Sequence, residues 1–159
     1  MKLIVVGKMK NSALKTLCAE YEKRLSRFGG VDIVELKDST LDAEAEAMLD
    51  KLKNFRGKVY AMSEEGTLMS STQLSKTLET DLMRGGSAFI IGSAYGLSDK
   101  VRQRADVIFS MSPMTFTHEF ARAILLEQLY RAKTISANVK GVEILPISLL
   151  ISPLLSINA

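Results

Sequence analysis

Apolar residues follow two different spacings along this chain, and the two spacings alternate. Short segments that are continuously apolar, or apolar at every second position, are typical of β-strands; they cover residues 2–6, 31–36, 58–62, 87–91 and 106–110. Between them apolar residues recur every three or four positions, as on one face of an α-helix. Helices are predicted to begin at Asn11 or Ser12, at Leu41, at Ser71 or Thr72, at Ser98 and after Thr117.

This alternation predicts an α/β fold with a mostly parallel sheet and helices on both faces. Ligands of such sheets bind outside the carboxyl ends of the strands. The loops that follow Met62, Ile91 and Ser110 are therefore expected to form one site. Neither an internal repeat nor a linker interrupts the pattern, so residues 1–138 are expected to be a single domain.

The last 21 residues, 139–159, have a different composition. After Lys140 and Glu143 they form an apolar run that is broken by Pro146 and Pro153. Exposed to water, this run would promote aggregation, so we expect it to pack on the domain or on a second subunit, or else to be disordered. It is too short to span a bilayer, and the start of the chain lacks the basic region of a signal peptide.

Composition narrows the chemistry further. The chain has 159 residues, 47% of them hydrophobic, which is enough for a full core. One cysteine, Cys18, and one histidine, His118, form neither a disulfide framework nor a Cys/His metal site, so we expect a cytoplasmic protein without a metal ion. The net charge is +3, with two basic zones flanking an acidic middle. That distribution permits a polyanionic partner but also fits an ordinary solvated surface.

Two loops carry candidate binding chemistry. The segment Gly92–Leu97 has glycines that permit a tight turn and close approach to a ligand. It fits neither a dinucleotide-binding nor a P-loop spacing, so on its own the segment favours a structural turn. The segment Met111–Phe116 is stiffened by Pro113, and its soft apolar side chains suit a purine and a thioether as well as an ordinary loop.

The helix after Thr117 carries the remaining candidates. His118 is either a capping or hydrogen-bonding group or a base that works at neutral pH. Arg122 projects between Leu126 and Leu129 on an apolar face, so its guanidinium needs a partner, either an anionic ligand or a carboxylate of another helix. A serine hydrolase is not supported, because the G-x-S-x-G motif is absent around Ser93.

In this order, these motifs resemble the SPOUT methyltransferases, and within them the family of the ribosomal RNA large-subunit methyltransferase H. The resemblance covers residues 1 to about 138 and depends on Met1–Lys8, Glu20–Leu25, Gly92–Leu97, Met114–Phe116, His118, Arg122 and Glu127–Ala132.

The resemblance implies a trefoil knot at the carboxyl end of the sheet, a homodimer, and S-adenosylmethionine as cofactor. The implied product is N3-methylpseudouridine in 23S rRNA of the large subunit or assembled ribosome. The implied cofactor-binding residues are Met62, Gly92, Met111, Ser112, Pro113, Met114, Thr115 and Phe116. His118 and Arg122 would be catalytic, and Tyr130 and Arg131 would lie on the side that faces the RNA.

Three features depart from the family pattern. The family usually has a second glycine where this chain has Ser93, and a proline where it has Thr117. The family normally ends soon after Asn138 with a short basic segment that contains His or Tyr, whereas this chain continues into the apolar tail. Two alternatives therefore stay open: a knotted dimer that binds cofactor or RNA without turnover, and a SPOUT methyltransferase that acts on tRNA.

Overall fold

A parallel β-sheet forms the centre of the computed structural model, which describes residues 1–138; the predicted apolar tail lies outside the described residues. Its strands are in the order β2-β1-β4-β3-β5, and every neighbouring pair is parallel. The strands are β1 (Lys2–Val6), β2 (Asp32–Leu36), β3 (Lys58–Leu68), β4 (Ser87–Ile91) and β5 (Val107–Ser110). This arrangement confirms the predicted parallel sheet.

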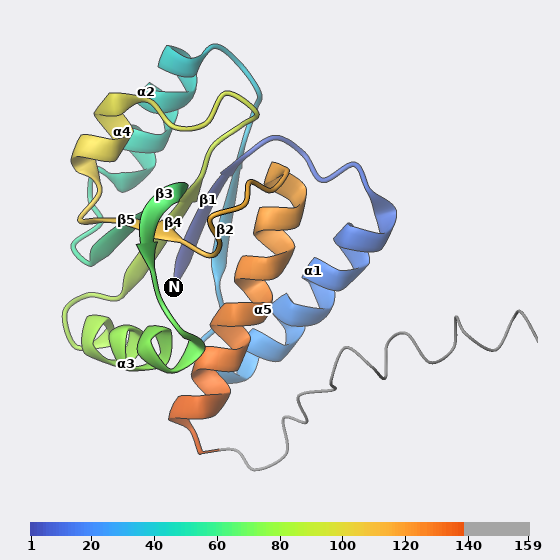
Figure 1. The fold of residues 1–159 in the computed structure, drawn as a ribbon, viewed down its shortest axis with the longest axis vertical. Helices are drawn as coiled ribbons and strands as arrows, with labels where there is room; N and C mark the ends of the chain where they lie inside the picture. The colour runs from blue at the N-terminus through green and yellow to red at the C-terminus, as the bar shows by residue number, and fades with distance from the viewer. Residues whose placement is uncertain (139–159) are drawn as a thin grey trace, which may run out of the picture.

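Helices cover both faces of the sheet, as predicted (Figure 1). One face carries α1 (Ser12–Leu25), α3 (Ser71–Leu82) and α5 (His118–Ser136), with α5 lying between the other two. The opposite face carries α2 (Leu41–Leu52) and α4 (Asp99–Arg104). A short 3-10 helix, η1 (Ser26–Phe28), follows α1.

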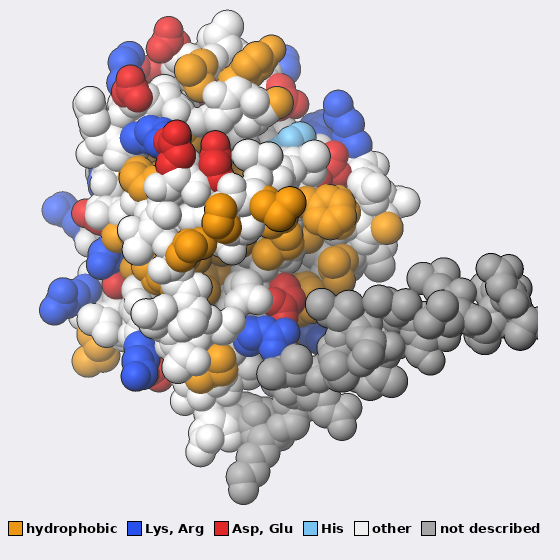
Figure 2. All heavy atoms as spheres, in the orientation of Figure 1, with side chains coloured by type: hydrophobic (Ala, Val, Ile, Leu, Met, Phe, Trp, Pro, Cys, Tyr) orange, Lys and Arg blue, Asp and Glu red, His pale blue; other side chains and the backbone are white. Residues whose placement is uncertain are grey.

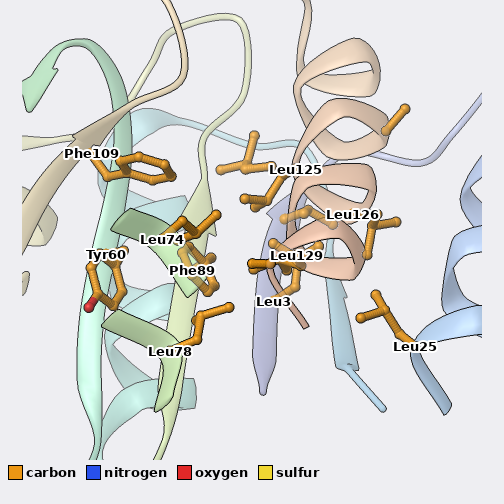
Figure 3. Close-up of a cluster of buried hydrophobic side chains, with 14 of the residues drawn as sticks. Leu3, Leu25, Tyr60, Leu74, Leu78, Phe89, Phe109, Leu125, Leu126 and Leu129 are labelled. Carbon is orange, nitrogen blue, oxygen red and sulfur yellow. The ribbon is translucent and has the colours of Figure 1, made fainter. Parts of the chain in front are cut away.

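Strand side chains alternate between these two layers because successive residues of a strand point to opposite faces. Leu3 and Val5 of β1 belong to the core beneath α1, α3 and α5, whereas Ile4 and Val6 belong to the core beneath α2 and α4. Figure 3 shows the larger core, in which leucines of α5 pack against the strands. The whole of β4 is buried, which matches its continuous run of apolar residues.

Side-chain caps fix where the helices begin. In each of the five α-helices within residues 1–138, the N-cap side chain accepts a hydrogen bond from a backbone amide in the first turn. The caps are Asn11, Thr40, Ser70, Ser98 and Thr117. The prediction that Ser71 or Thr72 caps α3 is wrong. Ser70 is the cap, because it forms a reciprocal capping box with Gln73.

The third strand is longer than its pattern predicts. We expected it to end at Met62, but β3 continues to Leu68 after a break in its pairing with β5 between Met62 and Thr67. Because the residues in this break are mostly polar, the spacing of hydrophobic residues does not predict that the strand continues. The bulge moves Ser63 and Glu64 out of the ladder and into a cleft at the end of the sheet.

A buried polar cluster closes the opposite, amino-terminal edge of the sheet. Asp81 of α3 is 3% exposed and accepts hydrogen bonds from Tyr60 Oη at 2.5 Å and Ser87 Oγ at 2.8 Å. Burial, followed by this bond to Asp81, raises the pKa of Tyr60. The cluster ties α3 to the start of β4, far from the carboxyl ends of the strands.

Among the described residues, no helix is both long enough and apolar enough to cross a membrane.

Candidate active site

A cleft of about 1140 Å³ lies where the loops after β3, β4 and β5 meet the start of α5. Met62, the segment 91–97 and most of the segment 111–117 line it, so the three strand-end loops converge as predicted. The volume slightly exceeds the usual range for small-molecule sites, about 300–1,000 Å³. Parallel strands place their ligands at this edge, because the loops that follow them all emerge there.

The structure brings together seven of the eight residues predicted to bind a cofactor. The cleft is lined by Met62, Gly92, Met111, Ser112, Met114, Thr115 and Phe116. Pro113 lies within the same loop but is not among the lining residues. Met114 is 73% exposed and Phe116 is 41% exposed, so the loop presents apolar side chains at the surface beside the cleft.

Close backbone packing shapes the loop after β4. A Cβ atom added at Gly92 would stand 2.6 Å from the carbonyl carbon of Gly96, and closer still to its oxygen. Gly96 has a φ of 75°, a left-handed conformation that glycine adopts without strain. The Gly96 amide donates to the Ser93 carbonyl oxygen at 3.0 Å, which closes the turn. Only a residue without a side chain fits at position 92.

Serine side chains hold the loop after β5. Ser110 Oγ donates to the Ser112 carbonyl oxygen at 2.8 Å, and Ser112 Oγ accepts from the Met114 amide at 3.0 Å. These local bonds fix the course of the loop without using the apolar side chains that line the cleft. The loop therefore has a defined shape and an apolar lining.

His118, the first residue of α5, lines the cleft at the end next to β1. In Figure 2 the single histidine, in pale blue, lies above a group of exposed apolar side chains. A Cβ atom added at Gly7 would be 3.1 Å from His118 Nε2 and 3.0 Å from Asp38 Oδ1. The imidazole and the Asp38 carboxylate therefore both border the space that Gly7 leaves open.

Glu119 anchors the β1–α1 connection to this end of α5. Its Oε2 atom accepts from the backbone amides of Asn11 at 2.9 Å and Lys10 at 3.0 Å. The bond from Asn11 is the main cause that lowers the pKa of Glu119, and the bond from Lys10 adds to it. This contact fixes Asn11, which also lines the cleft.

Arg122 lies outside the set of residues that line the cleft. Its side chain is 11% exposed, with Nη1 at 2.6 Å from Glu35 Oε2 and Nη2 at 3.8 Å from Glu22 Oε1. The predicted need for a partner is thus met by carboxylates of β2 and α1. Among the described residues, its Nε atom is buried without a hydrogen-bond partner. A catalytic role for Arg122 stays a prediction.

Tyr130 and Arg131 lie more than three turns along α5 from His118 and do not line the cleft. Tyr130 packs against Tyr21 and Phe28, and the Arg24 guanidinium lies 5.7 Å from its ring centre. Arg131 forms an ion pair with Glu127, four residues earlier on the helix. Their predicted contact with RNA also stays a prediction.

Several residues that line the cleft were missed by the analysis of the sequence. Arg102 of α4 donates to Ser63 Oγ at 3.1 Å and to Glu65 Oε2 at 3.2 Å, which fixes the β3 bulge over the cleft. Glu64 lines the same wall. These residues were missed because they depend on the bulge inside β3, which the spacing of hydrophobic residues does not reveal. Within residues 1–138, no group of three His, Cys, Asp or Glu side chains is arranged to hold a metal ion.

The fold is a parallel sheet covered on both faces, and three of its strand-end loops converge on a cleft. The sequence assigns this fold to a class of methyltransferases. Residues 1–140 match the family model described as a predicted SPOUT methyltransferase. The chain belongs to the SPOUT methyltransferase family, whose members use S-adenosylmethionine as methyl donor. The resemblance noted from the sequence is confirmed.

Within that family the chain is similar to proteins named ribosomal RNA large subunit methyltransferase H. The relative from Syntrophotalea carbinolica is 42% identical over 147 residues, covering 86% of this chain and 94% of the relative. The relative from Streptococcus gordonii is 40% identical over 147 residues, covering 83% and 92%. The relative from Gloeobacter violaceus is 37% identical over 144 residues, covering 86% and 94%.

Solved structures support the fold at low sequence identity. A probable methylase family protein from Haemophilus influenzae superimposes with a TM-score of 0.57 at 12% identity, covering 98% of this chain and 75% of that one. A probable methyltransferase from Bordetella pertussis gives a TM-score of 0.53 at 11% identity, covering 82% and 92%.

The cleft fits the family's cofactor. Its lining combines methionine and phenylalanine side chains, which suit an adenine ring and a thioether, with polar groups of Ser63, Glu64 and Ser112. The absence of a side chain at Gly92 keeps the backbone of its loop close to the cleft. Residues of this chain are thus suited to both ends of an amphipathic nucleoside.

Proposed function

We propose that this protein methylates N3 of a pseudouridine in 23S rRNA, in the large ribosomal subunit or the assembled ribosome. The support is the similarity to relatives named ribosomal RNA large subunit methyltransferase H, whose lengths the chain covers almost completely. The observation that carries the proposal is the cleft itself, where the loops after β3, β4 and β5 meet beside the one histidine. Because its proposed substrate is the ribosome or its large subunit, we expect the protein to act in the cytoplasm.

The three loops hold the cofactor and orient it. Met62, Gly92 and the segment 111–116 form the walls of its site, including Pro113, which stiffens the last loop. S-adenosylmethionine supplies a methyl group activated by a positively charged sulfur. Because methyl transfer requires in-line approach of the accepting nitrogen, the main task of the loops is positioning.

His118 serves as the base. The imide nitrogen of the target ring bonds a proton that must leave before or as the methyl group arrives, and an imidazole nitrogen of His118 accepts it. His118 lines the cleft and, as the first residue of α5, occupies a fixed place behind the Thr117 cap. The carboxylate of Asp38 and the imidazole of His118 both lie beside Gly7.

Arg122 would stabilise negative charge on a carbonyl oxygen of the target ring. Its guanidinium is already paired with Glu35, so contact with the substrate requires exchange of that partner. Comparison of Arg122→Lys with Glu35→Gln tests this role. Methyl transfer is expected to fall for Arg122→Lys, because lysine lacks the planar fork, and to persist for Glu35→Gln. Equal losses would instead assign Arg122 a structural role.

Exposed lysines surround this end of the sheet. Lys8 and Lys10 lie in the β1–α1 connection, Lys15 lies in α1 and Lys37 follows β2. None of the four forms a salt bridge within residues 1–138, so their charges are available to phosphates. The bond between Glu119 and the Lys10 amide holds this connection beside His118. We assign these lysines to the RNA-binding surface.

A homodimer would complete the site. Tyr130 and Arg131 are twelve or more residues beyond His118 on a straight helix, about 18 Å away at 1.5 Å per residue. Within one subunit they are therefore too far from the cleft, and they would contact RNA bound at the cleft of the other subunit of a dimer. Exposed apolar side chains on α1 and α5, Leu17, Phe120 and Ile135, support such an interface. Sedimentation of the protein as a monomer at micromolar concentration would contradict this assignment.

The trefoil knot is also part of the proposal. The strand β5 lies at one edge of the sheet, whereas α5, which follows it, packs over β1 and β4 in the middle. The connecting segment 111–117 must cross the carboxyl ends of the strands beside the loop 92–97. An experimental chain trace in which this connection runs outside the loops would contradict the knot.

The test of the proposed function is transfer of a labelled methyl group to ribosomes that lack the modification. The expected result is incorporation into 23S rRNA, with N3-methylpseudouridine identified by mass spectrometry of nucleosides. Incorporation into tRNA would replace this proposal with the tRNA alternative. Binding of S-adenosylhomocysteine without incorporation into either RNA would support the alternative of a knotted binding protein.

A further inference from the structure

The loop after β4 is attached to the opposite helical layer by a buried carboxylate. Glu44, in the first turn of α2, is only 2% exposed. Its Oε2 atom accepts from Ser93 Oγ at 2.8 Å, and its Oε1 atom accepts from the Ser39 amide at 3.0 Å. Within residues 1–138, no cation forms a salt bridge with this carboxylate. A buried charge of this kind depends on its hydrogen bonds.

The other end of that bond is a residue of the cleft. Ser93 lines the cleft, forms a bridge with Gly96, and also accepts a bond from the Tyr95 amide at 3.3 Å through Oγ. Glu44 does not line the cleft and lies beneath it. The carboxylate therefore holds the loop through a single hydroxyl group, from helix α2 of the opposite layer.

We propose that Glu44 is a positioning residue for cofactor binding, acting through Ser93 to fix the Gly92–Leu97 loop in the shape that receives the ligand. The inference rests on the proposed location of the cofactor in this cleft. The backbone at Gly92 packs so closely against Gly96 that an added Cβ would clash, and the bond from Ser93 to Glu44 ties this tightly packed loop to α2. Loss of the bond would release the loop while β4, buried along its length, stays in place.

The chain offers a matched control at the other end of the same strand. Ser87 Oγ donates to the buried carboxylate of Asp81 at 2.8 Å, the same length as the bond between Ser93 and Glu44. Each carboxylate keeps one further donor when its serine is removed, namely Tyr60 for Asp81 and the Ser39 amide for Glu44. Ser87→Ala thus reproduces the loss of a buried bond far from the cleft.

The experiment measures the Kd of S-adenosylhomocysteine by calorimetry, together with the Tm, for the wild type, Ser93→Ala, Ser87→Ala and Glu44→Gln. We expect Ser93→Ala to raise the Kd about tenfold and Ser87→Ala to change it less than twofold, although both lower the Tm. Glu44→Gln keeps a side-chain acceptor for Ser39 and a polar partner for Ser93, so its Kd should lie near the wild-type value.

Three outcomes would overturn the inference or its basis, and they are distinguishable. An unchanged Kd for Ser93→Ala would show that the bond is only structural. An equal rise for Ser87→Ala would show that general destabilisation, not the loop, weakens binding. Failure of the wild type to bind S-adenosylhomocysteine at all would contradict the cofactor site itself, and with it the proposed function.

Discussion

Replacement of Gly92 by alanine tests the shape of the cleft most sharply. The added Cβ would stand 2.6 Å from the carbonyl carbon of Gly96, whereas ordinary contacts begin at 3.4 Å. The Gly92–Leu97 loop must therefore shift by about 1 Å, because the obstacle is backbone and not the end of a flexible side chain. A misplacement of that size costs about a hundredfold in catalysis, and overpacking costs about 1–3 kcal/mol of stability.

The assay compares Gly92→Ala with Gly57→Ala, in which the added Cβ would stand 2.7 Å from the carbonyl oxygen of Gly85 at the amino-terminal edge of the sheet. Both variants are expected to lose stability in urea titrations. Only Gly92→Ala is expected to lose methyl transfer about a hundredfold and to bind S-adenosylhomocysteine more weakly. A Gly92→Ala protein with wild-type affinity and rate would refute the assignment of this loop to the cofactor.

Three further predictions concern single side chains. Tyr60→Phe should lower the free energy of unfolding by about 1.5–3 kcal/mol, because it removes a hydrogen bond to a buried carboxylate. Folding raises the pKa of Tyr60, so the stability that this tyrosine contributes is present below pH 10 and is lost as the pH rises above that value. Only the wild type should therefore show this loss of stability at alkaline pH. Glu119→Gln should remove stability that is present above the ordinary carboxyl pKa of 4.5 and is lost as the pH falls through the lowered pKa of Glu119, so acid titrations of the two proteins should converge; parallel curves would refute the role of its bonds to Asn11 and Lys10. His118→Ala should reduce methyl transfer about 10²–10⁴-fold with little change in the Kd of S-adenosylhomocysteine, and an active variant would exclude His118 as the base.

Much of the fold follows from local rules that the sequence displays directly. The strands β1 and β4 have the predicted bounds because continuous apolar runs between turns have few other interpretations. The caps at Ser98 and Thr117 were equally readable. The cap of α3 was misplaced because three hydroxyl residues, Ser70, Ser71 and Thr72, stand together, and only the pairing with Gln73 chooses among them.

The sequence predicted the loops of the site, because these follow directly from the ends of the strands. It did not predict the side-chain contacts between elements that are distant in the sequence. Seven of the residues predicted to bind the cofactor line the cleft, because the carboxyl ends of parallel strands meet at one edge of the sheet. The partners of Arg122 were open, since the register of β2 and the packing of α1 decide which carboxylates reach it. The hydrogen bond between Glu44 and Ser93 joins residues 49 positions apart, and no residue spacing in the sequence predicts it.

The central claim is that the methyl donor binds in the cleft formed by the loops after β3, β4 and β5. Irradiation of the protein with methyl-labelled S-adenosylmethionine, followed by tryptic digestion, tests it directly. We predict label in the peptide of residues 105–122, which contains the loop after β5 and His118. A shallow groove on the outer face of α1 is lined mainly by residues of the tryptic peptide 16–23, and label confined to that peptide would contradict the account.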